Sequence, residues 1–244
     1  MVRAVIVVAV LLLASGCTTP EALPAPTFTA VDSVGHTYAG GFNFFVGGGV
    51  AAFDCNQDRM PDLFLAGGEG PSTLLVNRSE PGEIRFEGTP GSAVMEGVTG
   101  AYPVDFDSDG ILDLAALRFG ENVLLRGLGD CRFERANERW GFDGGAEWTT
   151  AFSARWTEDG FPDLALGNYL VIVEDEDRRS DWTCEENALL SGAVDGFGPA
   201  TALRPSHCTL SLLFTDWDGS GSADLRVSND RHYYVDGQEQ LWDL

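Results

Sequence analysis

The chain has 244 residues, enough for one domain with a large core. It carries 38 acidic residues against 15 basic ones, a net charge of −23, and every basic side chain is an arginine. So acidic a surface argues against nucleic acid as a partner and against direct attraction to anionic lipid. The 30 glycines and 11 prolines, with little sustained helical periodicity, predict a turn-rich all-β protein.

Residues 1–16 are predicted to be a signal peptide. Arg3 precedes an apolar run over residues 4–14 that is too short to span a bilayer well. The run ends in Leu-Ala-Ser-Gly-Cys, which resembles a bacterial lipobox and predicts that Cys17 is lipidated. The alternative is an ordinary secretory signal with a chance cysteine. In both cases the mature chain is expected to be exported, and as a lipoprotein it would lie at the cell surface or on a periplasmic membrane face.

Residues 17–27 follow as a short tether. Pro20, Pro24 and Pro26 stand among small residues, a composition typical of a semi-extended linker. Residues 28–244 are predicted to form the folded part, divided into four units at about residues 28–86, 87–133, 134–198 and 199–244.

Each unit contains a short acidic loop, over residues 54–62, 105–113, 155–163 and 216–224. The loop at 105–113 has carboxylates at positions 1, 3, 5 and 9, a glycine at position 6 and a backbone carbonyl to offer at position 7. Such converging oxygens repel one another unless a cation neutralises them, and Ca²⁺ suits a flexible cage of oxygen ligands. Three loops, at 54–62, 105–113 and 216–224, keep most of these oxygen-bearing positions. Their predicted ligands are Asp54, Asn56, Asp58, Met60, Asp62, Asp105, Asp107, Asp109, Ile111, Asp113, Asp216, Asp218, Ser220, Ser222 and Asp224.

The loop at 105–113 is not expected to be an EF-hand. Position 12, where an EF-hand has a bidentate glutamate, is Ala116, and the flanking apolar run reads as a strand rather than a helix. Asp113 at position 9 is expected to replace that glutamate.

The loop at 155–163 departs most from the pattern. Arg155 and Thr157 stand at positions 1 and 3, while Asp159 and Asp163 remain. We expect a metal-free turn in which Arg155 supplies the positive charge by pairing with Asp159 or Asp163. Ca²⁺ is expected to be structural, holding the strands on either side of each of the other three loops.

The first positions of the four loops are 51, 50 and 61 residues apart, which predicts propeller blades or a related β array. The sequence Gly-Gly-Val-Ala-Ala-Phe-Asp at 48–54, the acidic loop and Pro-Asp-Leu-Phe-Leu at 61–65 together resemble an FG-GAP or VCBS-type repeat. The resemblance implies integrin-α-like β-propeller blades with Ca²⁺ in an inter-strand loop. Residues 184–190 and 227–230 are similar to the cartilage acidic protein (ASPIC/UnbV-associated) group of these propellers. Because such propellers usually have about seven blades, four units indicate a partial or truncated ring, a short paralogue or an open array.

Four cysteines besides Cys17 suit two disulfides in an exported chain. The preferred pairing is Cys184 with Cys208, as a bridge inside one unit, which leaves Cys55 with Cys131. Three pairings remain open from the sequence. The spacings contain no Cys-x-x-Cys, so zinc is not expected.

The sequence shows no catalytic constellation, so no catalytic residue is predicted. His36, His207 and His232 lack ligand spacing and are expected to be surface or hydrogen-bonded residues, and the tryptophans are expected to belong to the core. Residues 174–181 are a charged insertion, read either as a solvated loop or as a further cation or partner site.

The favoured function is a cell-surface binding or adhesion module for an extracellular protein or a glycan, which touches the membrane through its lipid anchor alone; the adhesion part rests on the family resemblance. The alternatives are an accessory or catalytic domain of a polysaccharide-degrading system, and an incomplete structural fragment of a longer propeller.

Overall fold

The computed structural model of the chain describes residues 25, 27, 29–30, 34–91, 93–157, 160–171, 183–230 and 239–244. The chain divides into two compact units, residues 1–31 and 32–244, and every element named below belongs to the second. The predicted signal peptide, Cys17, Asp159, the insertion at 174–181 and His232 lie outside the described residues. Among the described residues, no helix is long and apolar enough to cross a bilayer.

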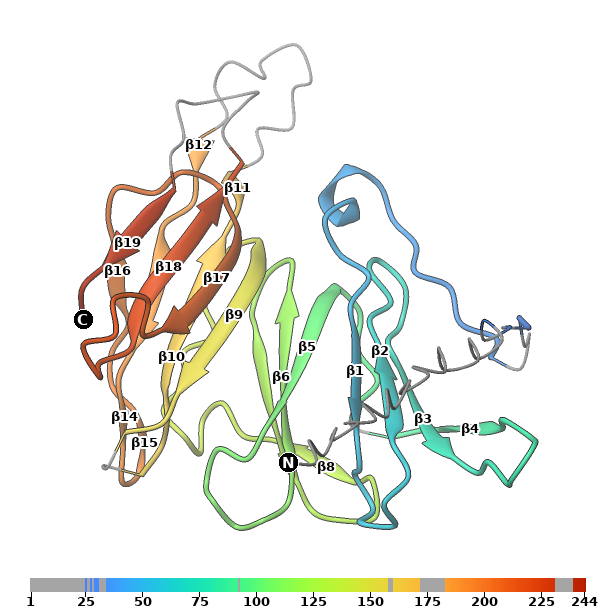
Figure 1. The fold of residues 1–244 in the computed structure, drawn as a ribbon. Coiled ribbons are helices and arrows are strands. Elements are labelled where there is room, and N and C mark those ends of the chain that lie inside the picture. Colours follow the sequence, from blue (N-terminus) through green and yellow to red (C-terminus); the bar gives the residue numbers. More distant parts are fainter. Residues whose placement is uncertain are drawn as a thin grey trace, which may run out of the picture. The chain divides into compact units, whose positions relative to one another are not determined.

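Four antiparallel sheets follow one another along the chain, as Figure 1 shows. The first contains β1 (Val50–Phe53), β2 (Asp62–Leu65), β3 (Thr73–Asn77) and β4 (Phe86–Thr89). The second contains β5 (Val98–Val104), β6 (Asp113–Arg118), β7 (Val123–Gly127) and β8 (Phe133–Arg135).

The third sheet contains β9 (Thr149–Arg155), β10 (Asp163–Asn168), β13 (Asn187–Leu190) and β16 (Thr201–Leu203). The fourth contains β17 (Thr209–Thr215), β18 (Asp224–Asn229) and β19 (Gln240–Trp242). Smaller elements are the 3-10 helix η1 (Phe42–Phe44) and two hairpins, β11 (Leu170–Val171) with β12 (Thr183–Cys184) and β14 (Gly192–Ala193) with β15 (Gly196–Phe197).

The predicted all-β fold is confirmed: each sheet is a meander of sequential strands, as in a propeller blade, and together they make a partial propeller-like array. The predicted unit boundaries were wrong at the outer strands. Strand β4 pairs back onto β3 and β16 pairs back onto β13, so each belongs to the sheet before the boundary that the sequence pattern indicated.

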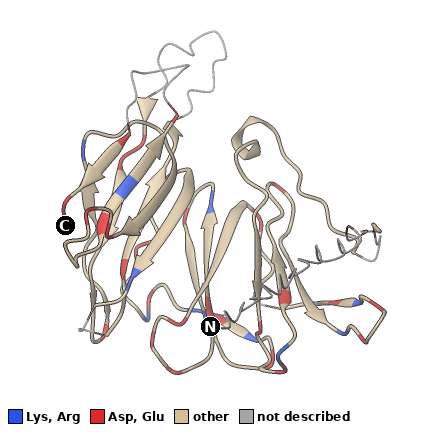
Figure 2. Cartoon of the chain, viewed as in Figure 1, with Lys and Arg blue, Asp and Glu red and all other residues tan. Residues whose placement is uncertain are grey.

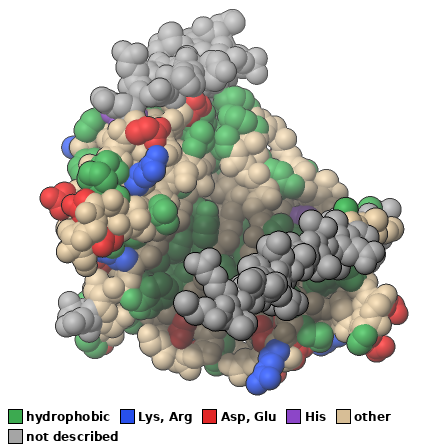
Figure 3. Space-filling view, in the orientation of Figure 1, with side chains coloured by type: hydrophobic (Ala, Val, Ile, Leu, Met, Phe, Trp, Pro, Cys, Tyr) green, Lys and Arg blue, Asp and Glu red, His purple; other side chains and the backbone are tan. Residues whose placement is uncertain are grey.

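Side chains on the second strand of each sheet fill the junctions between sheets by simple alternation. Leu114 and Ala116 of β6 pack in one cluster with Phe64 of the first sheet. The residue between them, Ala115, points the other way, into a cluster with the third sheet. The pattern repeats between the third and fourth sheets, where Ala165 packs with the pair formed by Leu225 and Val227. Apolar residues on both faces of a strand therefore build a core at each junction, and Figure 3 shows hydrophobic side chains between the sheets.

Buried asparagine and threonine side chains connect the later sheets. Asn122 donates from Nδ2 to Thr149 Oγ1 over 2.8 Å, and that hydroxyl donates to Asn168 Oδ1 over 2.7 Å. The same two bonds, both 2.8 Å, recur at the next junction through Asn187, Thr209 and Asn229. We call these bonds the Asn–Thr relay; no motif in the sequence predicts it.

Both predicted disulfides are confirmed, but their placement differs in part. Cys55 and Cys131 join the first sheet's acidic loop to the turn between β7 and β8, with Cα atoms 4.7 Å apart. Cys184 and Cys208, 4.5 Å apart at Cα, join β12 to the residue before β17. The second bridge therefore joins the β11–β12 hairpin to the start of the fourth sheet rather than lying inside one unit. Each disulfide fixes a junction.

Not every aromatic residue belongs to the core. Trp140 and Trp148 are buried as expected, whereas Trp156 and Trp217, each at position 2 of an acidic loop, are 56% and 59% exposed. His36 is hydrogen-bonded as expected, through Nδ1 to Thr73 and through Nε2 to the carbonyl of Ala66.

Candidate metal centre

The acidic loops all occupy the same place, between the first and second strands of a sheet. In three of the loops the residue before the loop pairs with the residue at position 9, as Phe53 does with Asp62 and Val104 with Asp113. In the loop at 155–163, Arg155 at position 1 pairs with Asp163. Because the strands on either side are hydrogen-bonded neighbours, the loop must reverse the chain within a few residues. Figure 2 shows acidic positions in these loops as well as elsewhere on the chain.

Three of the loops share one hydrogen bond from a backbone amide to a side-chain carboxylate. The carboxylate at position 1 accepts the amide of position 6: Asp54 from Arg59 over 2.7 Å, Asp105 from Gly110 over 3.0 Å, and Asp216 from Gly221 over 3.0 Å. Positions 4 and 6 have positive φ in all three, with 70° at Arg59, 84° at Gly110 and 92° at Gly221 for position 6. The three loops are thus one conformation with different side chains, and glycine suits position 6 because it adopts positive φ without steric cost.

The loop at 105–113 has the densest carboxylate cluster. Oxygens of Asp105, Asp107 and Asp109 lie within 4.8 Å of one another. Asp107 Oδ1 is buried and has no hydrogen-bond partner among the described residues. A buried carboxylate oxygen without a partner is costly unless a cation satisfies it, so these residues fit a bound cation.

Arg126 on β7 faces the same cluster from outside the loop. Its guanidinium contacts Asp107 Oδ2 at 2.8 Å and Asp109 Oδ2 at 2.6 Å. It therefore holds the outer oxygens of both carboxylates and leaves Asp107 Oδ1 unengaged. No sequence motif marks this residue, because only the pairing of β6 with β7 brings it beside the loop.

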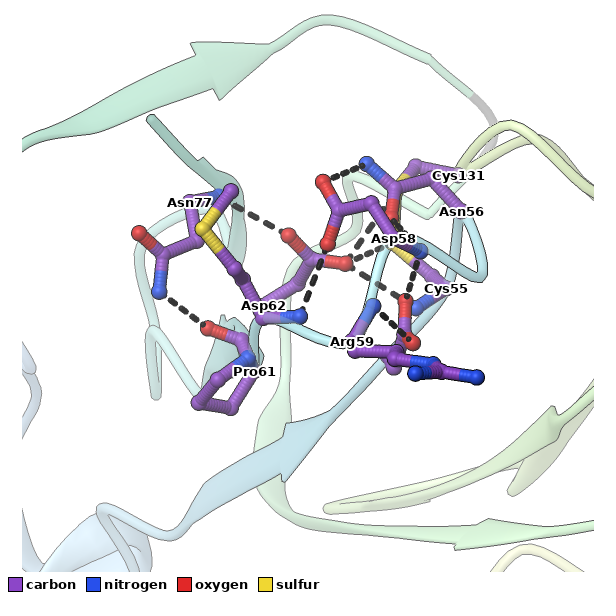
Figure 4. The surroundings of a disulfide bond; sticks show 10 residues. Cys55, Asn56, Asp58, Arg59, Pro61, Asp62, Asn77 and Cys131 are labelled. Atoms are coloured by element: carbon purple, nitrogen blue, oxygen red, sulfur yellow. Dashed lines mark hydrogen bonds between the residues drawn. A yellow bond between two sulfur atoms is a disulfide. The ribbon is translucent and has the colours of Figure 1, made fainter. Parts of the chain in front are cut away.

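The loop at 54–62 has a mixed set of candidate oxygen donors, which includes carboxylates and an amide, as Figure 4 shows. Asn56 Nδ2 donates to Asp58 Oδ2 over 2.9 Å, and the amide of Met60 donates to Asp58 Oδ1 over 2.8 Å. The loop contacts its neighbour as well, since Gln57 donates from Nε2 to the carbonyl of Gly110 over 3.3 Å. The first two acidic loops thus lie side by side.

The loop at 216–224 is the most exposed of the three. Asp218 Oδ1 accepts the amide of Ser220 over 2.9 Å, and this bond lowers the pKa of the Asp218 carboxyl. Ser220 Oγ in turn accepts the amide of Ser222 over 3.2 Å. The hydroxyl takes the role that a carboxylate has in the other two loops.

The aspartates at position 9 are buried and serve the strands. Asp113 accepts the amide of Phe106 over 2.7 Å and that of Gly127 over 2.8 Å. Asp62 accepts the amides of Cys55 and Asn77 in the same way, as Figure 4 shows. Burial raises the pKa of Asp62, and it raises that of Asp113 to about 7, with Asp107 and Asp105 adding to the rise. These carboxylates bridge three strands, and their predicted role as metal ligands stays a prediction.

The loop at 155–163, whose sequence differs most from the acidic pattern, is stabilised by its arginine. Arg155 Nε contacts Asp163 Oδ2 at 3.1 Å, which confirms the expected pairing, and the guanidinium also donates to the carbonyl of Ala223. It lies 5.1 Å from the ring centroid of Phe214. The arginine at position 1 therefore connects this loop to the fourth sheet.

Comparison with known proteins supports the repeat. A family model described as the FG-GAP-like repeat matches residues 54–116, which include the first acidic loop and all of the second. No curated protein matches the chain. The repeat and the propeller-like sheets indicate an extracellular binding module of the propeller type, and the two disulfides are in keeping with export.

Proposed function

We propose that the chain is a Ca²⁺-stabilised binding module that is anchored to a bacterial membrane by lipid on Cys17 and engages an extracellular protein or a glycan. Its role is recognition rather than catalysis, and Ca²⁺ is structural. The adhesion role rests on likeness to FG-GAP-type repeats, which commonly serve extracellular recognition.

One observation supports the metal above all others. The buried Asp107 Oδ1 has no hydrogen-bond partner among the described residues, and it belongs to a cluster of three carboxylates. Asp105, Asp107 and Asp109 would hold the ion in this loop. The loops at 54–62 and 216–224 share its backbone conformation and offer Asp54, Asn56 and Asp58, or Asp216, Asp218 and Ser220.

Thermal unfolding of residues 18–244 tests this role. We expect one cooperative transition, whose midpoint temperature is higher in millimolar Ca²⁺ than in EDTA. Mg²⁺ should raise the midpoint temperature less, because it demands stricter geometry and gives up its water reluctantly. In Asp107→Asn the rise with Ca²⁺ should shrink. Equal midpoint temperatures in Ca²⁺ and in EDTA, together with no heat of Ca²⁺ binding by calorimetry, would refute the proposal.

The anchor has a separate test. Expressed in a bacterium with its leader, the protein should partition into detergent and incorporate labelled fatty acid, and Cys17→Ser should abolish both. Incorporation that is unchanged in Cys17→Ser would contradict lipidation at this residue.

A further inference from the structure

A cavity of about 180 Å³ lies against the third sheet, away from the acidic loops. Its floor includes Leu166 on β10 and Ala188 on β13, and the connection between β8 and β9 covers it with Phe142. Pockets for whole small molecules measure about 300–1,000 Å³. A cavity of this size suits a single side chain.

Small residues leave this space open. Leu166 pairs with Ala188, and Ala188 pairs with Ala202 on the edge strand β16, so the three side chains share one face of the sheet. Ala188 and Ala202 present only methyl groups on this face, so the cavity is apolar where these two strands line it.

The rim of the cavity is acidic. Asp143, Glu147 and Glu186 line it, and Glu186 pairs with Arg204 at 2.6 Å. Neither Asp143 nor Glu147 forms an ion pair with an arginine in the part of the chain that the structure describes. Glu147 Oε2 accepts the amide of Ala146 over 2.7 Å, which leaves its charge without a cationic partner. An apolar lining beside carboxylates that have no cationic partner matches a group with an aliphatic stem and a cationic head.

We propose that this cavity binds the side chain of an arginine or lysine on a protein partner. The inference rests on the proposed recognition function and names the chemistry of its partner. The stem packs on Leu166 and Ala188 while the cation lies between Asp143 and Glu147. The net charge of −23 attracts basic surfaces at long range, which favours a basic protein over an acidic one.

The test uses a short acetylated, amidated peptide with a single arginine among glycines, titrated into the protein in Ca²⁺ and followed by calorimetry and amide chemical shifts. The matched peptide carries citrulline, which has the same shape without the charge. We expect the arginine peptide to shift amides of residues 142–147 and 186–190, and the citrulline peptide to bind at least ten-fold more weakly.

Two kinds of variant separate the carboxylates from the apolar lining. Asp143→Asn with Glu147→Gln removes the charges, and Ala202→Leu narrows the cavity from the exposed edge strand; each should weaken binding at least five-fold. Asp130→Asn is the control, because Asp130 is an exposed acid on another loop. Added salt should weaken binding of the arginine peptide.

Equal binding of the two peptides, or unchanged binding in both variants, would overturn the inference. Tighter binding of spermidine than of the peptide would also overturn it and assign the cavity to a free polyamine. The proposed role of Ca²⁺ fails separately, through the absence of a Ca²⁺ effect on unfolding, so the two outcomes are distinguishable.

Discussion

Arg126 shows how a single side chain adjusts a metal loop from outside it. Its guanidinium neutralises part of the charge on Asp107 and Asp109. In the other two predicted metal loops, no arginine of the described residues forms an ion pair with a predicted ligand. We therefore expect the loop at 105–113 to keep its conformation without a cation better than the other two loops do.

Replacing Arg126 should show how much this side chain stabilises the loop in the absence of a cation. In EDTA, Arg126→Gln should reduce the free energy of unfolding by about 1–2 kcal/mol, because two partly buried ion pairs are lost. In Ca²⁺ the loss should be smaller, since the ion neutralises the same carboxylates. Urea unfolding in both conditions measures the difference, with Arg135→Gln as a control in which an exposed ion pair to Glu121 is removed. An equal loss in Ca²⁺ and EDTA would contradict this role.

Glu185 makes stability depend on pH. Its carboxylate accepts the amide of Trp148 over 2.6 Å, and burial, aided by nearby Glu147, raises its pKa from 4.5 to about 7. Between these values the folded state holds a proton that the unfolded state has released, so the contribution of Glu185 to stability is present below pH 4.5 and is lost as the pH rises towards 7.

Glu185→Gln keeps an acceptor for the Trp148 amide and removes the titration. At pH 7.5 the variant should be more stable than the wild type by about 1–2 kcal/mol, a value reduced for the partial exposure of Glu185, and at pH 4.5 the two should agree. Thermal unfolding at fixed Ca²⁺ across this range gives the comparison. Exposed Glu138→Gln serves as the control, and a constant difference between Glu185→Gln and the wild type at every pH would refute the assignment.

At the scale of elements, the strands and loops were predictable to different degrees. The segments 63–66, 123–126 and 225–227, rich in leucine and other apolar residues, overlap strands β2, β7 and β18, as the sequence composition favours. The loop spacing identified where the chain turns. The position-9 aspartates were read as ligands because sequence spacing places them in the loop, whereas their bonds to the amides of Phe106 and Gly127 depend on the pairing of the strands.

The shared loop conformation has a testable weak point at Arg59. This residue has φ of 70° at a position where the other two loops have glycine, and a side chain with a Cβ is strained there. Arg59→Gly should raise stability by up to about 1 kcal/mol, because relief of strain exceeds the added entropy of the unfolded chain. The reverse change, Gly110→Ala, should lower stability by a similar amount in the same urea assay. A lower free energy of unfolding in Arg59→Gly would show that the Arg59 side chain makes a contact that stabilises the protein by more than the backbone strain costs.

At the scale of the molecule, the sequence indicated how many repeats there are but not how they join. Outer strands such as β16 carry no loop motif, so the spacing of motifs placed them in the wrong unit. The Asn–Thr relay could not be predicted from the spacing of the motifs either, because Asn122 and Thr149 come from different sheets. Cysteine parity, in contrast, needed no geometry to predict two bridges.

The two disulfides should differ in their contribution to stability. Cys55 and Cys131 are 76 residues apart, and Cys184 and Cys208 are 24 apart. A longer closed loop restricts the unfolded chain more, so the pair of alanine substitutions at Cys55 and Cys131 should cost about 1 kcal/mol more than the pair at Cys184 and Cys208. Urea midpoints of the two double variants measure this. A larger cost at Cys184 and Cys208 would show that native contacts, rather than chain entropy, dominate.

The Asn–Thr relay also sets the order in which the array comes apart. At the first junction the residue matching Thr149 and Thr209 is Val98, so the first sheet lacks this connection. It is joined to the second sheet by the Cys55–Cys131 bridge and by backbone bonds such as that between Gly68 and Val98. In a reducing solution the first sheet is held to the second mainly by their shared apolar core and backbone bonds, so we expect it to open first and to exchange its amide protons before the remaining three sheets do.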